Sequence, residues 1–151
     1  MTLSVGAHAP DFALPSPSGA SISLSALLAN GPVVLFFYPK DGTAGCTVEA
    51  CAFRDRHDEF VGVGAQVVGV SSDSVVSHAR FASKHDLPMI LLSDEDGKVR
   101  TLYGVSPKLG LFPGRTTFVI DRDGVVRYVL ESQLRWDAHS REALSVVKQL
   151  R

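Results

Sequence analysis

The sequence predicts an α/β fold with a central mixed β-sheet flanked by helices. Three apolar stretches, residues 33–38, 66–71 and 89–92, alternate with segments of helical periodicity, a pattern typical of parallel strands joined by crossover helices. Two more strand-like stretches, 116–121 and 125–130, are separated only by a three-residue turn and predict an antiparallel hairpin late in the chain. Strands of both directions are therefore expected in one sheet.

The first part of the chain predicts a small hairpin and then the central strand. Residues 10–14 and 20–24 flank a turn cluster of Pro, Ser and Gly, and Ser25 is expected to cap a short helical turn after them. Residues 33–38 are rich in β-branched and aromatic side chains and end at Pro39. Such a run is typical of a strand that is buried on both faces.

Helical periodicity predicts the next elements. Residues 46–61 are expected to form one amphipathic helix that buries Val48, Cys51, Ala52, His57 and Phe60 and leaves Glu49, Arg54, Asp55, Asp58 and Glu59 on other faces. A second helix, capped by Asp73 or Ser74 and reaching Lys84, is expected to bury Val75, Val76, Ala79 and Phe81. A short helix ending near Tyr103 and a last helix beginning near Asp137 complete the prediction.

Size and charge limit the classes of function. The 151 residues are 45% hydrophobic and 21% charged, which fits one domain spanning residues 1–151. A net charge of −1 gives no general attraction to nucleic acid or anionic lipid. The longest apolar run is far shorter than the roughly 20 residues of a membrane helix, and the first residues lack the pattern of an export signal. We therefore expect a cytoplasmic protein without a membrane or nucleic-acid partner.

The chain contains only two cysteines, Cys46 and Cys51. So few thiols point to a reducing compartment, where paired cysteines are more often catalytic or metal-binding than structural. Cys46 follows the first buried strand and a glycine-containing turn, so it falls in the first turn of the next helix. Unpaired N–H groups and the helix dipole favour an anion there, and the thiol is expected to ionise more readily than a free thiol. The alternative is a small buried core residue.

Residues 39–46 fit the P-x-x-x-T-x-x-C signature of peroxiredoxins. The wider stretch 37–51 resembles the bacterioferritin comigratory protein, or peroxiredoxin Q, branch, in which a second cysteine follows five residues after the first. This resemblance covers essentially the whole chain and implies a thioredoxin-like fold. Ala44 stands where that branch often has proline, which affects the rigidity of the loop rather than its chemistry.

The resemblance also implies roles for side chains around Cys46. Pro39 would cover the sulfur, and Thr43 would accept a peroxide proton; their simpler interpretations are a strand terminator and a helix N-cap. Arg115 would stabilise the thiolate and the charge that develops on the peroxide, although a lone arginine beside a strand is usually a solvated charge. Glu49 would orient Arg115, or would only complement the helix dipole.

Cys51 determines the predicted catalytic cycle. Attack of a thiolate on peroxide gives a sulfenic acid, which a second thiol captures as a disulfide. An intact helix holds positions five apart with about 8.6 Å between Cα atoms, whereas a disulfide tolerates roughly 7 Å, so the helix must open. If Cys51 only packs the helix, the protein is a one-cysteine peroxidase that uses an external thiol.

The sequence therefore predicts a thiol peroxidase that reduces hydrogen peroxide and organic hydroperoxides without cofactor or metal. By resemblance, thioredoxin is the expected reductant and the protein is expected to be a monomer. A thioredoxin-type dithiol oxidoreductase remains the rival class, but it needs a C-x-x-C motif. A zinc site needs four ligands, and the five histidines are scattered along the sequence: His8, His57, His78, His85 and His139.

Overall fold

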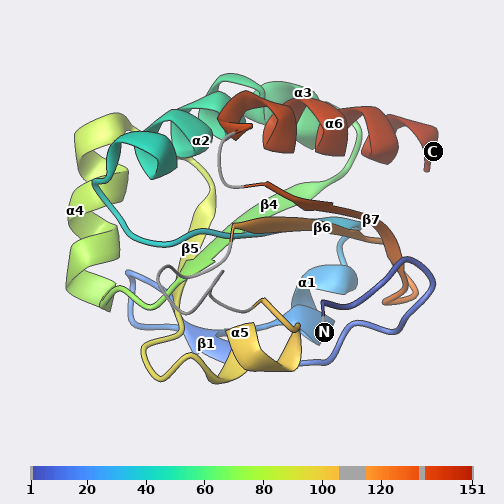
Figure 1. Cartoon of the computed structure of the whole chain (residues 1–151), viewed down its shortest axis with the longest axis horizontal. Coiled ribbons are helices and arrows are strands. Elements are labelled where there is room, and N and C mark those ends of the chain that lie inside the picture. Colours follow the sequence, from blue (N-terminus) through green and yellow to red (C-terminus); the bar gives the residue numbers. More distant parts are fainter. Residues whose placement is uncertain (1, 106–114, 133–134, 151) are drawn as a thin grey trace.

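A five-stranded mixed sheet forms the centre of the computed structural model, which describes residues 2–105, 115–132 and 135–150 (Figure 1). The strand order is β5-β4-β3-β6-β7. The strands are β3 (Val33–Phe37), β4 (Gln66–Ser71), β5 (Ile90–Ser93), β6 (Thr116–Ile120) and β7 (Val126–Glu131). β3, β4 and β5 run parallel, whereas β6 is antiparallel to both β3 and β7. This confirms the predicted mixed α/β sheet.

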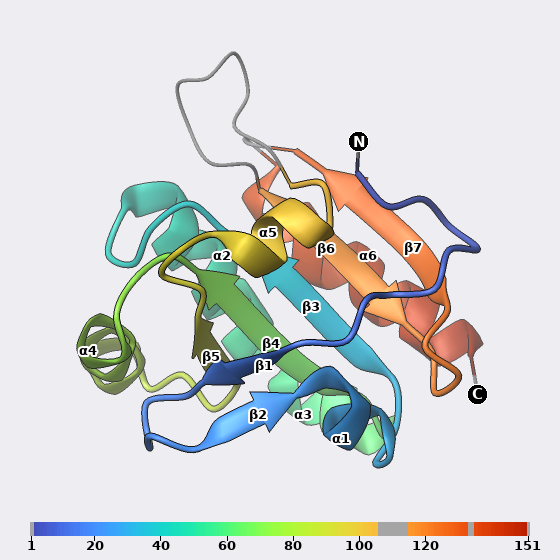
Figure 2. The same ribbon diagram turned by 90° about the horizontal axis from the view of Figure 1, so that it is seen from below.

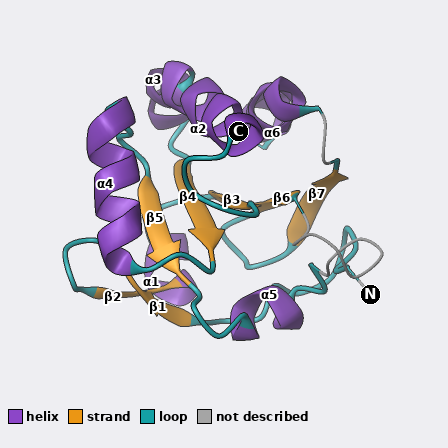
Figure 3. Cartoon of the chain, turned by 60° about the vertical axis from the view of Figure 1, so that its left-hand side comes forward, coloured by secondary structure: helices purple, strands orange, loops and turns teal. Residues whose placement is uncertain are grey.

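Helices cover both faces of the sheet, as Figures 1 and 2 show. One face carries α2 (Ala44–Asp55), α3 (His57–Gly62), α4 (Val75–His85) and α6 (Trp136–Gln149). The other face carries α1 (Leu24–Leu28), α5 (Lys98–Leu102) and the expected N-terminal hairpin of β1 (Ala13–Pro15) and β2 (Ser21–Ser23). The turned view in Figure 3 separates the two layers.

The central strand β3 is buried on both faces, as its composition predicts. Val34 and Phe36 belong to the core beneath α2, α3 and α6, while Leu35 and Phe37 belong to the core beneath α1 and α5. All five residues of β3 are buried. Alternation of side chains along a strand explains why an uninterrupted apolar run supplies two cores.

The predicted helix over 46–61 is instead two helices, which meet at Arg56. The guanidinium of Arg56 donates hydrogen bonds to Asp137 and Ser140 of α6, which fixes the chain at this junction. The expected faces are partly confirmed, because Ala52 and Phe60 are buried. They are wrong at two positions, since Val48 is 46% exposed whereas Glu49 is fully buried. A carboxylate is assigned to the surface by its polarity, but a buried cation supplies Glu49 with a partner.

The buried face of α4 and the cap of α1 also differ from the predictions. Val76 is 60% exposed, and His78 lies inside with Phe81. His78 is accommodated because both of its ring nitrogens form hydrogen bonds within the core. Ser23 rather than Ser25 caps α1, since its hydroxyl accepts a hydrogen bond from the Ala26 amide.

The register of the sheet places the signature loop beside Arg115. β3 ends at Phe37, which pairs with Thr116 at the start of antiparallel β6. The residue before β6 therefore lies at the same edge of the sheet as the loop that leaves β3. That loop leads directly into α2, so strand pairing brings Arg115 to the first turn of this helix.

None of the described helices has the length and apolar character needed to cross a bilayer.

Candidate active site

Cys46 lies in the first turn of α2, as predicted, and its side chain is only 1% exposed. Thr43, immediately before the helix, has an extended backbone, and the amide of Thr47 donates to its carbonyl. The amides of the first turn have no partner within a helix, and the helix dipole is positive at this end. The local backbone therefore favours a negatively charged sulfur at Cys46.

Arg115 contacts both Cys46 and Glu49. Its Nη2 donates to Cys46 Sγ at 3.4 Å, and its Nη1 donates to Glu49 Oε1 at 2.6 Å. Arg115 is 6% exposed and Glu49 is fully buried, so water does not screen this pair. Cys46 and Glu49 are three residues apart on α2 and face the same side of the helix. The structure thus brings together three of the predicted site residues.

Thr43 and Pro39 lie on the loop between β3 and α2. Thr43 is exposed, and its hydroxyl donates to the Lys40 carbonyl at 2.9 Å. Thr43 is the N-cap residue of α2 by position, as the simpler interpretation has it, but its side chain makes no capping hydrogen bond to the helix. Pro39 is half-buried and directly follows the last buried residue of the strand region, Tyr38.

A buried hydrogen-bond network fixes this loop to α4. The carboxylate of Asp41 accepts hydrogen bonds from Tyr38, at 2.5 Å, and from Ser77, at 2.9 Å. Its second oxygen also lies 2.7 Å from His78 Nδ1, while the Asp41 amide donates to Asp73. Potential metal ligands of Asp41, Asp73 and His78 lie within 4.8 Å of one another. The hydrogen bonds already engage those atoms, so we interpret the cluster as a support for the loop.

Arg100 was not identified from the sequence, because a basic residue in a short helix is ordinarily a solvated charge. Its Nη2 donates to the Tyr38 carbonyl at 2.8 Å, and its guanidinium lies 5.8 Å from the centre of the Phe37 ring. Burial lowers the pKa of Arg100, while Asp94 and Cys46 act in the opposite direction. Arg100 therefore fixes the residue before Pro39 and adds a second buried cation near Cys46.

Cys51 lies on the same unbroken helix as Cys46 but is separated from the Arg115 contact. It is half-buried and lines a surface groove together with Val48, Asp55 and Arg56. Both cysteines are free thiols. The helix between them is continuous, so helical geometry keeps their Cα atoms too far apart for a disulfide in this conformation.

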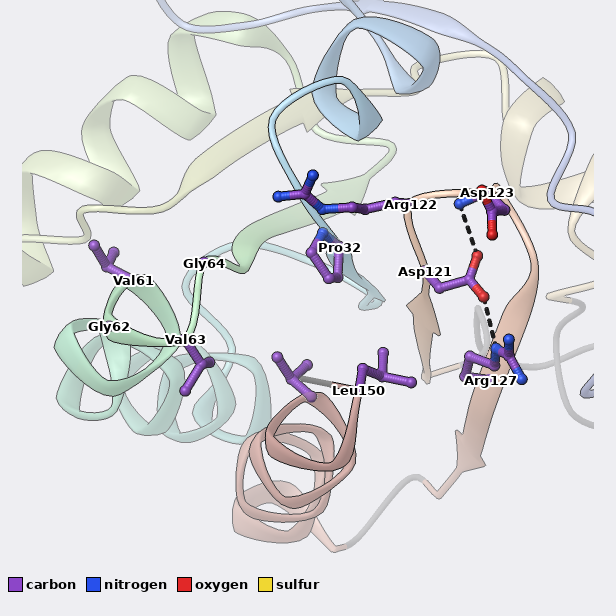
Figure 4. A pocket seen from close by; sticks show the side chains of 11 residues that line it. Pro32, Val61, Gly62, Val63, Gly64, Asp121, Arg122, Asp123, Arg127 and Leu150 are labelled. Atoms are coloured by element: carbon purple, nitrogen blue, oxygen red, sulfur yellow. Dashed lines mark hydrogen bonds and ion pairs between the residues drawn. The ribbon is translucent and has the colours of Figure 1, made fainter.

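A separate hollow lies at the opposite end of β3, where Pro32, Gly64 and the turn between β6 and β7 meet (Figure 4). Its acidic and basic groups are partly paired with each other. Asp121 accepts from Arg127 Nε at 2.6 Å and from the Asp123 amide at 2.9 Å. The hollow contains none of the predicted site residues.

The fold and the site together define a class of protein. A buried thiol lies at a helix N-terminus, after a central parallel strand and against an arginine, in a thioredoxin-like sheet. This is the arrangement in which a thiol can serve as a nucleophile. Residues 5–129 match the model of the AhpC/TSA family, and the chain belongs to this family.

Comparisons with individual proteins identify the branch. The chain is 45% identical over 149 residues to the chloroplastic peroxiredoxin Q of Oryza sativa subsp. japonica, covering 98% of this chain and 68% of that protein. Peroxidoxin BcpB of Mycobacterium tuberculosis superposes with a TM-score of 0.92 at 45% identity, covering 99% of each chain. The bacterioferritin comigratory protein of Xanthomonas campestris gives a TM-score of 0.84 at 31% identity, covering 92% of this chain and 91% of that one.

These findings confirm the resemblance stated from residues 37–51 and the thioredoxin-like fold. The protein is a peroxiredoxin, and hence a thiol peroxidase. The plant relatives are named as chloroplastic proteins, so they do not support the expected cytoplasmic location.

Replacement of Arg115 tests its contact with the thiol. Arg115→Met is expected to slow oxidation of the reduced protein by hydrogen peroxide about 100-fold, because loss of one donor to a developing oxyanion costs about 3 kcal/mol. The measurement is stopped-flow oxidation of the reduced protein. Arg127→Met, at the opposite end of the sheet, is the matched control. An unchanged rate in Arg115→Met would remove Arg115 from the site.

Proposed function

We propose that the protein reduces hydrogen peroxide and organic hydroperoxides through the thiolate of Cys46, without a cofactor. The observation that carries the proposal is the buried Cys46 sulfur with the Arg115 guanidinium at 3.4 Å. The thiolate attacks one peroxide oxygen, the O–O bond breaks, and Cys46 becomes a sulfenic acid. The other oxygen takes up a proton and leaves as water or alcohol.

Neighbouring groups give this step its geometry. Arg115 stabilises the thiolate and the negative charge that appears on the departing oxygen, and Glu49 orients the guanidinium. The Thr43 hydroxyl donates to the Lys40 carbonyl, so its oxygen can accept the proton of a bound peroxide. Pro39 shields the sulfur without offering an N–H group. The bacterioferritin comigratory protein of Xanthomonas campestris has alkyl peroxide reduction activity, which supports an organic substrate.

We propose Cys51 as the thiol that resolves the sulfenic acid. Its sulfur attacks Cys46, water leaves, and an intramolecular disulfide forms. A dithiol of the thioredoxin type then reduces this disulfide and is itself oxidised. Because α2 is intact between the two cysteines, this step requires the helix to open. We also propose that the protein acts as a monomer and in the cytoplasm.

The continuous helix also favours a second candidate. If α2 stays closed after oxidation, Cys51 does not reach Cys46, and an external thiol reduces the sulfenic acid directly. The protein would then be a one-cysteine peroxidase. Mass spectrometry of the oxidised protein distinguishes the two cycles, because only the first gives a Cys46–Cys51 disulfide.

The proposed function is tested with chelator-treated, reduced protein mixed with hydrogen peroxide or cumene hydroperoxide. With thioredoxin, thioredoxin reductase and NADPH, we expect NADPH oxidation that depends on both the peroxide and this protein. Replacing thioredoxin by glutaredoxin and glutathione identifies the reductant. A dithiol oxidoreductase would instead reduce insulin disulfides and leave the peroxide unconsumed, and that result would overturn the proposal.

A further inference from the structure

Behind Arg115 lies a second buried pair, Glu49 on α2 and His139 on α6. Both side chains are completely buried, and His139 Nδ1 lies 3.5 Å from Glu49 Oε2. The other groups around the imidazole are Thr117, whose hydroxyl is 2.7 Å from Nδ1, and Ser132, whose carbonyl is 2.9 Å from Nε2. The pair thus connects the candidate site to β6 and α6.

Hydrogen-bond partners determine which ring nitrogen of His139 carries hydrogen. The carbonyl of Ser132 only accepts, so Nε2 carries a hydrogen. In the neutral ring Nδ1 then has a lone pair, to which the Thr117 hydroxyl donates. That lone pair also faces Glu49 Oε2. A proton on either His139 Nδ1 or Glu49 Oε2 would relieve the repulsion between these two atoms.

The carboxyl group of Glu49 lacks a donor at this oxygen. Oε1 receives Arg115, but Oε2 has no hydrogen-bond partner within residues 2–105, 115–132 and 135–150. A buried, unpaired carboxylate oxygen is costly, whereas a proton on Oε2 removes its charge and its repulsion with the Nδ1 lone pair, which Thr117 already engages. The arrangement therefore has a place for one proton between Glu49 and His139.

We propose that Glu49 and His139 share one proton in the resting site, and that this neutral pair leaves the charge of Arg115 available to the Cys46 thiolate. His139 is a positioning residue in this scheme, because it acts through Glu49 and Arg115. The proposal rests on the proposed function, in which Cys46 reacts as a thiolate.

The electrostatic surroundings place the proton on Glu49. Burial raises the pKa of Glu49 to about 7, although Arg115 opposes this increase. Burial lowers the pKa of His139 to about 4, and Arg115 also disfavours the imidazolium. Arg135 and Glu142 also act on His139, and they form an ion pair with each other at 3.0 Å. Cys46 is the other ionisable group that contacts Arg115.

Ionisation of Glu49 changes the charge balance at Arg115. When Glu49 is neutral, the charges of the Cys46 thiolate and the Arg115 guanidinium add up to zero. With Glu49 ionised, two buried anions compete for the guanidinium of Arg115, and less of its positive potential remains for the departing peroxide oxygen. The rate of the peroxide step should therefore fall as pH rises through about 7, where Glu49 loses its proton.

The pH profile of the peroxide step tests this link. Trp136, the only tryptophan, lies against Gly45 beside Cys46, so its fluorescence is used to follow oxidation of reduced protein by hydrogen peroxide. Glu49→Gln, which cannot ionise, is expected to lack the decrease above pH 7. At pH 8 it should exceed the wild-type rate by up to about tenfold, because a group with this pKa is roughly 90% ionised there and tenfold is the limit in which the ionised form is inactive. Glu142→Gln on α6 is the matched control and should retain the wild-type profile.

Infrared spectroscopy tests the proton itself, independently of activity. Reduced protein at pH 6 is expected to show a buried protonated carboxyl band that Glu49→Gln lacks and Glu142→Gln retains. His139→Asn removes the ring acceptor and should move the disappearance of this band to lower pH. If Glu49→Gln retains the band, or if His139→Asn leaves its pH midpoint unchanged, the shared proton is overturned whatever the peroxidase assay shows. If the carboxyl band behaves as expected but Glu49→Gln has the same pH–rate profile as wild type, the link from Glu49 to Arg115 is overturned.

Discussion

Cys46→Ser is expected to abolish peroxide reduction, with a loss of at least 1000-fold in the rate of peroxide consumption. A serine hydroxyl is a far weaker acid than a thiol, and in this chemistry the thiolate is the nucleophile. The substitution nearly preserves volume at a site that is 1% exposed, so the fold should remain intact. Stopped-flow consumption of hydrogen peroxide, with circular dichroism as the check on folding, measures both effects.

Cys51→Ser is the matched control for the same experiment. It should consume about one equivalent of peroxide at the wild-type rate and then stop as a sulfenic acid, which a dimedone adduct detects by mass. Turnover by Cys46→Ser with thioredoxin, together with loss of the first oxidation in Cys51→Ser, would mean that the two roles are reversed. Full turnover of Cys51→Ser with a small thiol would support the one-cysteine cycle.

Oxidation is expected to unwind the first part of α2. A disulfide between Cys46 and Cys51 cannot form on an intact helix, and opening gives up several backbone hydrogen bonds worth about 1 kcal/mol each. Opening also withdraws Gly45 from Trp136, where a Cβ at Gly45 would lie only 2.7 Å from the indole. Amide hydrogen exchange should therefore accelerate across residues 43–54 in the oxidised protein.

The comparison protein for this exchange experiment is oxidised Cys51→Ser, which cannot form the disulfide and should keep α2 protected. In wild type, exchange in α4 and α6 should remain that of the reduced form. Equal protection of residues 43–54 in both redox states, with a mapped Cys46–Cys51 disulfide, would contradict the helical placement of these cysteines. A mixed disulfide with an external thiol would contradict the role of Cys51.

The sheet and the centre of the site could be predicted because short stretches of sequence determine them. The apolar run 33–38 contains enough β-branched and aromatic residues to fix a buried strand, and a turn that follows it places Cys46 at a helix start. The position of Arg115 was inferred from the family resemblance. Pairing of β3 with β6 gives the physical reason for it.

The remaining site residues depend on contacts between distant segments. Glu49 is buried because Arg115, 66 positions later, supplies its partner, and Arg100 reaches the Tyr38 carbonyl across 62 positions. Periodicity assigns polar side chains to the surface, so it misplaced Glu49 and His78 for the same reason. His139 appeared only as one of several scattered histidines, because its importance depends on α6 packing beside α2.

Two arginine contacts hold the ends of residues 39–55, the segment in which the proposed disulfide would form. Arg100 holds the Tyr38 carbonyl at one end, and Arg56 holds α6 through Asp137 and Ser140 at the other. Residues 39–55, a loop followed by α2, therefore lie between these two contacts, and the sheet need not respond if they rearrange. A protein that reduces the disulfide would then bind an opened loop within residues 39–55, while the surrounding surface keeps its structure. Re-closing then requires only a local conformational search between fixed ends, so its rate should be independent of the rate at which the whole protein folds.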